Sequence, residues 1–290
     1  MGKKLFARIL GNDIMTLHGV NQTLENLKFT TKHESDFVET DKTYILNRIA
    51  DRRKKELIIE HLNQNNIYYL DLPFEFHEFS KLPYLDFRTP PDRINQNSLL
   101  KMLVPYNLYL CNVNSCRNHI IEYGVENEYE FILPFDSNSF FSKSMFDNLF
   151  SSLSKETKYL VVPQLRIAEK GLRNEEILNQ EIDLQMFHKR EPQIVFRGDS
   201  VHRYEERIPY GIGCKAEFLN ALKVTGEWNG WLAQKRIGLE QRIFQDSKFE
   251  IRSGVFRLNP GNKSNEINSN YNNRIIGLWN MVHSISKKYK

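Results

Sequence analysis

The first half of the chain alternates short apolar runs with amphipathic segments, and this rhythm constrains the fold more than any other feature of the sequence. Apolar runs at 4–10, 43–49 and 67–73 are typical of strands, and the spacing of apolar residues in 21–34 and 51–66 predicts helices. Strands and helices that alternate through short connections form parallel pairs by right-handed crossovers. We therefore predict an α/β fold with an open mixed sheet flanked by helices.

The alternation is interrupted once before it resumes. Residues 74–106 combine many aromatic residues with prolines and little periodicity, which indicates an ordered insertion because a disordered tether would avoid so much aromatic surface. Three further strands and two further helices are predicted after it: strands at 107–113, 129–135 and 158–167, and helices at 115–126 and 142–156.

The second half is less regular and ends in a predicted helix at 274–286. We predict one domain over residues 1–290, in which 4–167 form the sheet and 168–290 cover it.

Composition excludes several classes of protein. The chain is 40 % hydrophobic, enough for a core, and its 40 Lys and Arg against 36 Asp and Glu leave a net charge of only +4, too little to imply nucleic acid as a partner. The N-terminal segment has no apolar stretch of signal-peptide length, and no apolar run is long enough to cross a bilayer, so we expect a cytoplasmic protein. The C-terminal KKYK allows at most peripheral contact with an anionic membrane.

Three cysteines, Cys111, Cys116 and Cys214, have spacings that fit neither a disulfide framework nor a zinc site. We interpret them as free thiols. The alternative is a nucleophilic Cys116, next to Arg117 and near His119, but neighbours in sequence do not make a spatial triad.

Candidate ligand-binding residues follow the predicted strands. In open α/β sheets, ligands bind outside the carboxyl ends of the strands. Asp13 follows the first strand, residues 115–118 open a helix, and Asp136 ends the strand FILPF. A helix N-terminus with Arg117 could hold a phosphate, and the Asp136 carboxylate could bind Mg²⁺ or Mn²⁺ that bridges a diphosphate. Alternatively, Asp136 belongs to an ordinary turn and Arg117 pairs with a surface acid.

The order of these features resembles the GT-A fold of nucleotide-sugar glycosyltransferases. In that fold, a run ending in Arg-Asn opens a helix and the next strand delivers an Asp-x-Asp metal motif. The matching residues here are Arg117, Asn118 and Asp136-Ser137-Asn138, with Asn138 replacing the last acid. The strings RILGND, LNRI and FDSN are also similar to uncharacterised proteins of bacterial capsule-type polysaccharide loci.

The resemblance implies a role for each candidate. Donor-binding residues would be Asn12, Asp13, Arg117, Asn118 and Asp136, on a UDP- or GDP-sugar, and the metal ligands for Mn²⁺ or Mg²⁺ would be Asp136 and Asn138. The acid that activates the hydroxyl of a glycan acceptor would be Glu227, Glu240 or Asp199, and Trp228 and Trp231 would hold the acceptor sugar.

Each implied role has a plainer alternative: the glutamates as solvated side chains and the tryptophans as core residues. The resemblance implies a glycosyltransferase of surface polysaccharide synthesis. Two other functions stay open, a carbohydrate-binding protein that has lost the metal site and a sugar-phosphate nucleotidyltransferase. The second usually carries a basic, Gly-rich loop after the first strand, and GNDIMTLHGVNQ contains no Lys or Arg.

Overall fold

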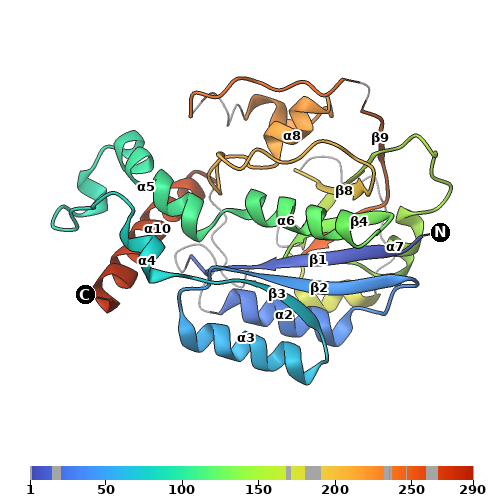
Figure 1. Cartoon of the computed structure of the whole chain (residues 1–290), viewed down its shortest axis with the longest axis horizontal. Helices are drawn as coiled ribbons and strands as arrows, with labels where there is room; N and C mark the ends of the chain where they lie inside the picture. Colours follow the sequence, from blue (N-terminus) through green and yellow to red (C-terminus); the bar gives the residue numbers. More distant parts are fainter. Residues whose placement is uncertain are drawn as a thin grey trace.

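A seven-stranded mixed sheet forms the centre of the computed structural model, which describes residues 2–14, 21–167, 171–179, 191–231, 235, 237–245, 247–258 and 267–289 (Figure 1). The strand order is β3-β2-β1-β4-β8-β6-β9. Strand β8 runs antiparallel to β4 and β6, and the other neighbours are parallel. The bounds are β1 (Lys4–Leu10), β2 (Thr40–Asn47), β3 (Tyr68–Leu72), β4 (Phe131–Asp136), β6 (Tyr159–Val162), β8 (Gln193–Arg197) and β9 (Phe249–Ile251).

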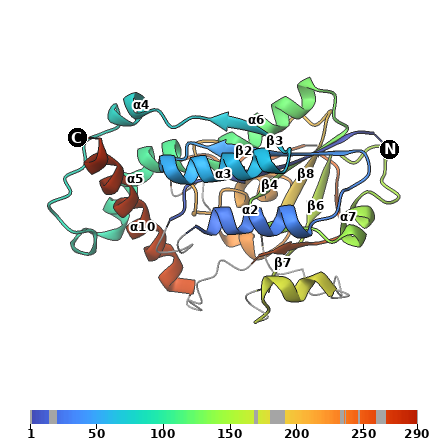
Figure 2. The same cartoon turned by 90° about the horizontal axis from the view of Figure 1, so that it is seen from below.

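Helices cover both faces of this sheet. Helices α2 (Gln22–His33) and α3 (Arg52–Gln64) lie on one face, and α6 (Val113–Glu126) lies on the other (Figures 1 and 2). Every residue of β1 is buried, because a central parallel strand has no solvent-facing side. The predicted α/β fold with an open mixed sheet flanked by helices is confirmed.

The inserted segment contains helices where we predicted a strand. Residues 107–113 form the end of α5 (Gln96–Leu110) and the start of α6, so the predicted strand at this position is wrong. Pro105 inside α5 would normally end a helix. Its neighbours Leu103, Tyr106 and Leu110 pack into a buried cluster with residues of α10 (Ile267–Lys288), and this tertiary burial outweighs the local preference.

A second sheet joins the two halves of the chain. Strands β5 (Ser139–Phe140) and β7 (Gln164–Arg166) come from the front half, and β10 (Val255–Arg257) from the back half lies between them. The predicted strand 158–167 is divided at Pro163 into β6 and β7, because proline interrupts the ladder of hydrogen bonds. The prediction of one domain over residues 1–290 stays a prediction.

The remaining elements are short: α4 (Phe76–Ser80), η1 (Pro91–Arg93), α7 (Lys143–Leu149), η3 (Asn174–Asn179), α8 (Ala216–Ala221) and η5 (Glu227–Gly230). The predicted helix 142–156 is therefore shorter than expected, and the C-terminal helix begins before 274. Within the described ranges, no helix combines the length and the apolar character that a membrane span requires.

Candidate functional site

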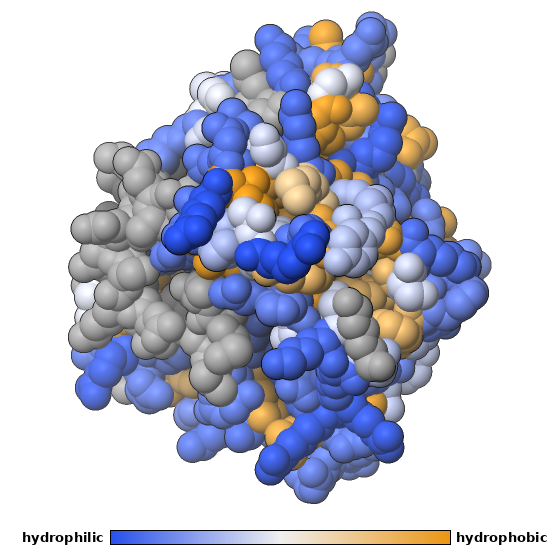
Figure 3. Space-filling view, turned by 90° about the vertical axis from the view of Figure 1, so that its left-hand side faces the viewer, coloured by the Kyte–Doolittle hydropathy of each residue, from blue (hydrophilic) through white to orange (hydrophobic). Residues whose placement is uncertain are grey.

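The strand order of the main sheet reverses between β1 and β4. From β1 the chain builds β2 and β3 on one side, and β4 then pairs with the other side of β1. Ligands of open α/β sheets bind where the strand order reverses in this way, outside the carboxyl ends of the strands. Asn12 and Asp13 follow β1 here, and Asp136 ends β4. Figure 3 looks at this side of the molecule, where hydrophilic side chains surround smaller hydrophobic areas.

Two buried cations hold the Asp136 carboxylate. Arg117 Nη2 donates to Asp136 Oδ1 at 2.6 Å, and Lys215 Nζ donates to Oδ2 at 3.1 Å. The side chains of Arg117 and Lys215 are 1 % and 2 % exposed, whereas that of Asp136 is 24 % exposed. Gln193 Nε2 donates a further bond to Oδ2, at 2.9 Å. The Asp136 carboxylate and the Arg117 guanidinium therefore lie in the same site, but they bond directly to each other.

Four separate elements bring these groups together. Asp136 ends β4, Arg117 lies in the second turn of α6, Gln193 opens the antiparallel β8, and Lys215 directly precedes α8. Strand β8 starts at this edge because its direction is opposite to that of β4. The Arg117 guanidinium also donates to Asn114 Oδ1 at 2.7 Å and lies 5.1 Å from the centre of the Tyr204 ring.

The electrostatics of the site keep Asp136 ionised. Burial on its own would raise the pKa of this carboxyl group, but the charges of Lys215, Arg117 and Arg257 and the bond from Gln193 hold its pKa well below the ordinary 3.8. Burial opposes the charge of Arg117, and Asp136 in turn raises the pKa of Arg117. Glu191 accepts a bond from Lys215 N at 3.2 Å. Among the described residues, the cations that act on Asp136 are therefore Lys215, Arg117 and Arg257.

The residues around Asp136 do not fit a divalent metal. Both carboxylate oxygens already accept bonds from cations, and a dication placed there would face Lys215 and Arg117. Among the described residues, no group of three His, Cys, Asp or Glu side chains could hold a metal ion. Asn138 Oδ1 is buried and has no hydrogen-bond partner, but a single amide oxygen does not make a metal site.

The residues next to Arg117 have structural partners. Helix α6 begins at Val113, not at Ser115, and the Asn112 side chain accepts a bond from Ser115 N, so its first turn is already capped. Asn118 accepts from Tyr204 N at 2.9 Å and donates to Tyr204 O and to Glu206 Oε1. These contacts make Asn118 a clamp on the segment after β8, and its expected role in donor binding stays a prediction.

Asn12 and Asp13 are also committed to the protein itself. Asn12 donates to Arg48 O and Leu110 O and accepts from Ala50 N at 2.9 Å. Asp13 pairs with Lys54 Nζ at 2.6 Å and accepts from the Thr23 hydroxyl and amide. Both side chains fasten the loops after β1 and β2. These bonds give no support to the expected contact of Asn12 and Asp13 with a donor, which stays a prediction.

Trp228 does not offer a ring face to a sugar. Trp228 is only 4 % exposed, belongs to the core beneath α6, and donates Nε1–H to Val224 O at 3.1 Å. Trp231 is partly buried and packs against the same core. The plainer alternative, a core residue, therefore describes Trp228, and the acceptor role of Trp231 stays a prediction.

Of the three candidate bases, Asp199 is placed at the wrong edge. It follows the end of β8, where Arg197 pairs with Phe131 at the amino end of β4, and it forms ion pairs with Lys158 and Arg197. Strand β4 has six residues, so Asp199 and Asp136 lie at opposite edges of the sheet, about 20 Å apart along the strand direction. Glu227 and Glu240 are exposed, and their expected role as a base stays a prediction.

Cys111 and Cys116 are not nucleophiles in this structure. All three cysteines are buried and unbridged, as expected. Burial raises the pKa of both Cys111 and Cys116 to about 12, so their thiols stay protonated at neutral pH.

Sequence reasoning missed Lys215, Gln193 and Arg257, which complete the surroundings of Asp136. The local signal at Lys215 is the turn Gly211-Ile212-Gly213, in which both glycines have positive φ. That signal marks a turn before a helix and does not show that the lysine will be buried against β4.

No family model and no curated protein matches the chain. Solved structures with a similar chain path include S. aureus TarS 1–349 in complex with UDP, at TM-score 0.35 and 13 % identity over 76 % of this chain and 56 % of that one. A second structure of S. aureus TarS 1–349 gives TM-score 0.38 and 11 % identity over 99 % and 73 %. An active-site mutant of LgtC gives TM-score 0.32 and 10 % identity over 94 % and 83 %. The chain thus spans just over half the length of the first of these structures.

Proposed function

We propose that this protein is a nucleotide-sugar glycosyltransferase of GT-A type that binds its donor at the carboxyl end of β4. One observation carries the proposal: the reversal of strand order between β1 and β4 coincides with a cluster of cations around Asp136. That position is the ligand crevice of open α/β sheets, and the diphosphate of a nucleotide sugar is the complementary anion. The acceptor in this proposal is a hydroxyl group of a surface glycan.

In this proposal, cations of the chain stabilise the leaving group. The glycosidic bond to the diphosphate breaks as an acceptor hydroxyl attacks the sugar, and negative charge accumulates on the diphosphate. Lys215 and Arg117 are 2 % and 1 % exposed, so in this proposal Lys215 turns from Asp136 toward the diphosphate and stabilises that charge together with Arg117 behind it. Asp136 is a positioning residue that holds the two cations at the strand tip. Glu227 or Glu240 accepts the proton of the attacking hydroxyl.

The expected Mn²⁺ or Mg²⁺ has no part in this proposal. Asp136 was its expected ligand, and the contacts of Asp136 with Arg117 and Lys215 oppose a dication there. We therefore expect donor binding to be the same in excess EDTA and in Mn²⁺.

Calorimetric titration with UDP and GDP tests the donor site. Lys215→Met should weaken binding about tenfold or more, because a charge-assisted hydrogen bond is worth about 1.5–3 kcal/mol. The matched control is Lys158→Met, which removes a lysine paired with Asp199 at the opposite edge and should leave affinity unchanged. Equal affinity in Lys215→Met and the unchanged protein would contradict the site.

A carbohydrate-binding protein on the same fold is the second candidate. It is favoured by the engagement of both Asp136 oxygens within the protein. Thermal unfolding with UDP- and GDP-sugars separates the two, since a donor at 100 times its dissociation constant stabilises by about 2.7 kcal/mol. Stabilisation accompanied by release of the nucleoside diphosphate supports the transferase, whereas no effect of any nucleotide sugar supports the second candidate.

A further inference from the structure

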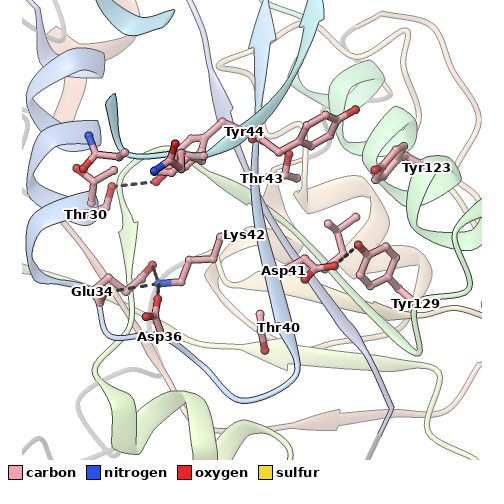
Figure 4. A pocket seen from close by; sticks show the side chains of 16 residues that line it. Thr30, Glu34, Asp36, Thr40, Asp41, Lys42, Thr43, Tyr44, Tyr123 and Tyr129 are labelled. Carbon is pink, nitrogen blue, oxygen red and sulfur yellow. Dashed lines mark hydrogen bonds and ion pairs between the residues drawn. The ribbon is translucent and has the colours of Figure 1, made fainter. Parts of the chain in front are cut away.

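A cavity lies at the amino edge of the main sheet, at the opposite end of the strands from the proposed donor site. Its volume is about 570 Å³, within the range of about 300–1,000 Å³ that small-ligand pockets occupy. It forms where β3 is shorter than β2. Tyr68, the first residue of β3, pairs with Thr43, so Thr40, Asp41 and Lys42 of β2 have no partner in β3. Figure 4 shows Tyr123 and Tyr129 on one side of β2, and Thr30 and Glu34 on the other.

Aromatic rings line the α6 side of this cavity. Tyr68 is 56 % exposed, and its ring lies 6.4 Å from that of Tyr123 with 25° between the planes. Two nearly parallel rings, one of them open to solvent, offer an apolar surface to a flat ligand. Large exposed aromatic side chains beside a cavity are characteristic of binding sites.

Hydrogen-bonding groups surround these rings. Asp41 is about half exposed, and its Oδ2 accepts from Tyr129 at 2.5 Å and Lys3 at 2.7 Å. Its Oδ1 accepts no hydrogen bond from any described residue, so this oxygen is available to a ligand. Thr43 faces the same side, because it is paired in register with Tyr68, but it is buried and its hydroxyl donates to Tyr68 O at 3.0 Å.

The charges of the cavity exclude an anionic ligand. Its charged groups are already paired: Asp41 with Lys3, Glu34 with Arg8, and Asp36 and Glu34 with Lys42. Helices α2, α3 and α6 all end at this edge, and helix C-termini carry partial negative charge. A ligand here should be neutral, rich in hydroxyl groups and apolar on one face.

We propose that this cavity binds a neutral oligosaccharide of β-linked glucose-type rings, whose axial C–H face packs on Tyr68 and Tyr123 while ring hydroxyls bond to Asp41. The bound sugar chain would lie at the amino edge of the sheet, and the proposed donor site lies at the carboxyl edge. This proposal stands apart from the proposed transferase activity, because binding alone tests it.

Titration with cellohexaose and chitohexaose, followed by calorimetry, tests the cavity. At least one of them should bind the full chain, and Tyr68→Ala should weaken that binding about tenfold, the loss of one aromatic contact. Tyr68→Phe should retain the binding. Tyr84→Ala removes a tyrosine that is 78 % exposed elsewhere on the surface and serves as the matched control. Lys215→Met should bind these sugars normally even if it no longer binds nucleotide. The proposed cavity and the proposed donor site can therefore be rejected independently of each other.

Two results would overturn the proposal. One is the absence of binding of either hexasaccharide to the unchanged protein at millimolar concentration. The other is equal binding by Tyr68→Ala and the unchanged protein. If Tyr68→Ala does not fold, Asp41→Asn replaces it: weaker binding supports the cavity, and unchanged binding rejects it.

Discussion

Asp136 lies between the buried side chains of Arg117 and Lys215 and supplies a counter-charge to both. A buried charge without a partner is far more costly than a buried pair, so the three groups depend on one another. The same dependence holds the two cations at the strand tip, where the proposed diphosphate binds. Stability and binding are therefore linked at this single carboxylate.

Replacing the carboxylate should destabilise the fold as well as the site. Asp136→Asn leaves Arg117 and Lys215 buried without a counter-charge, and we expect a loss of about 3–5 kcal/mol in the free energy of unfolding. Urea denaturation at pH 7 measures it. Asp147→Asn is the control, because it breaks an exposed pair with Lys143 and should change stability by less than about 1 kcal/mol. A loss as small as that of the control would show that the cluster is not a coupled unit.

The pH dependence of the same variant follows from the lowered pKa of Asp136. A carboxyl group with a lower pKa in the folded state stabilises the protein above its unfolded pKa of about 3.9, and this contribution is lost as the pH falls toward the folded pKa. The stability difference between the unchanged protein and Asp136→Asn should therefore be constant from pH 7 to 5 and shrink below about pH 4. A difference that stays constant down to pH 3 would contradict this electrostatic account.

At the scale of elements, α6 fixes the segment that delivers Lys215. Asn112 Nδ2 donates to Glu206 O, Asn114 Nδ2 donates to Glu205 O and Cys214 O, and Asn118 bonds Tyr204 and Glu206. One face of the helix thus holds both ends of the connection between β8 and α8. Arg117 lies on the same helix, so both cations take their positions from α6.

Loosening this connection should be visible in hydrogen exchange. Asn118→Ala removes the acceptor of the Tyr204 amide, and we expect that amide and its neighbours to exchange at least about fivefold faster, since a buried donor left without its acceptor costs about 1–3 kcal/mol. Asn127→Ala removes an exposed bond at the other end of α6 and should leave the Tyr204 amide unchanged. Equal exchange rates of the Tyr204 amide in the two variants would show that Asn118 does not hold the connection between β8 and α8.

For the whole molecule, periodicity predicted the parts of the fold that local sequence controls. Strand β1 is buried throughout, β2 and β4 each contain a run of five buried residues, and helix α3 has one apolar face, so pattern alone identifies these elements. The end of α5 was mistaken for a strand because Pro105 obscured its helical spacing. Its helical state depends on contacts with α10, more than 160 residues later in the chain, which no local window contains.

The candidate site was predictable only in part, for the same reason. Asp136 and Arg117 come from consecutive elements, so the expectation that they lie together required only the strand order. Lys215 and Gln193 reach Asp136 through the antiparallel β8 and the turn before α8, and neither arrangement has a local signature. From the sequence alone, Trp228 was expected to pack against a sugar ring. Its burial results from the whole fold and could not be predicted from the neighbouring residues.

The crystal structure of the protein with UDP or GDP bound tests the central claim most directly. Our account predicts the diphosphate at the carboxyl end of β4, with its oxygens within hydrogen-bond distance of Lys215 Nζ. A nucleotide bound at the amino edge, or elsewhere with the contacts of Asp136 to Arg117 and Lys215 unchanged, would contradict it.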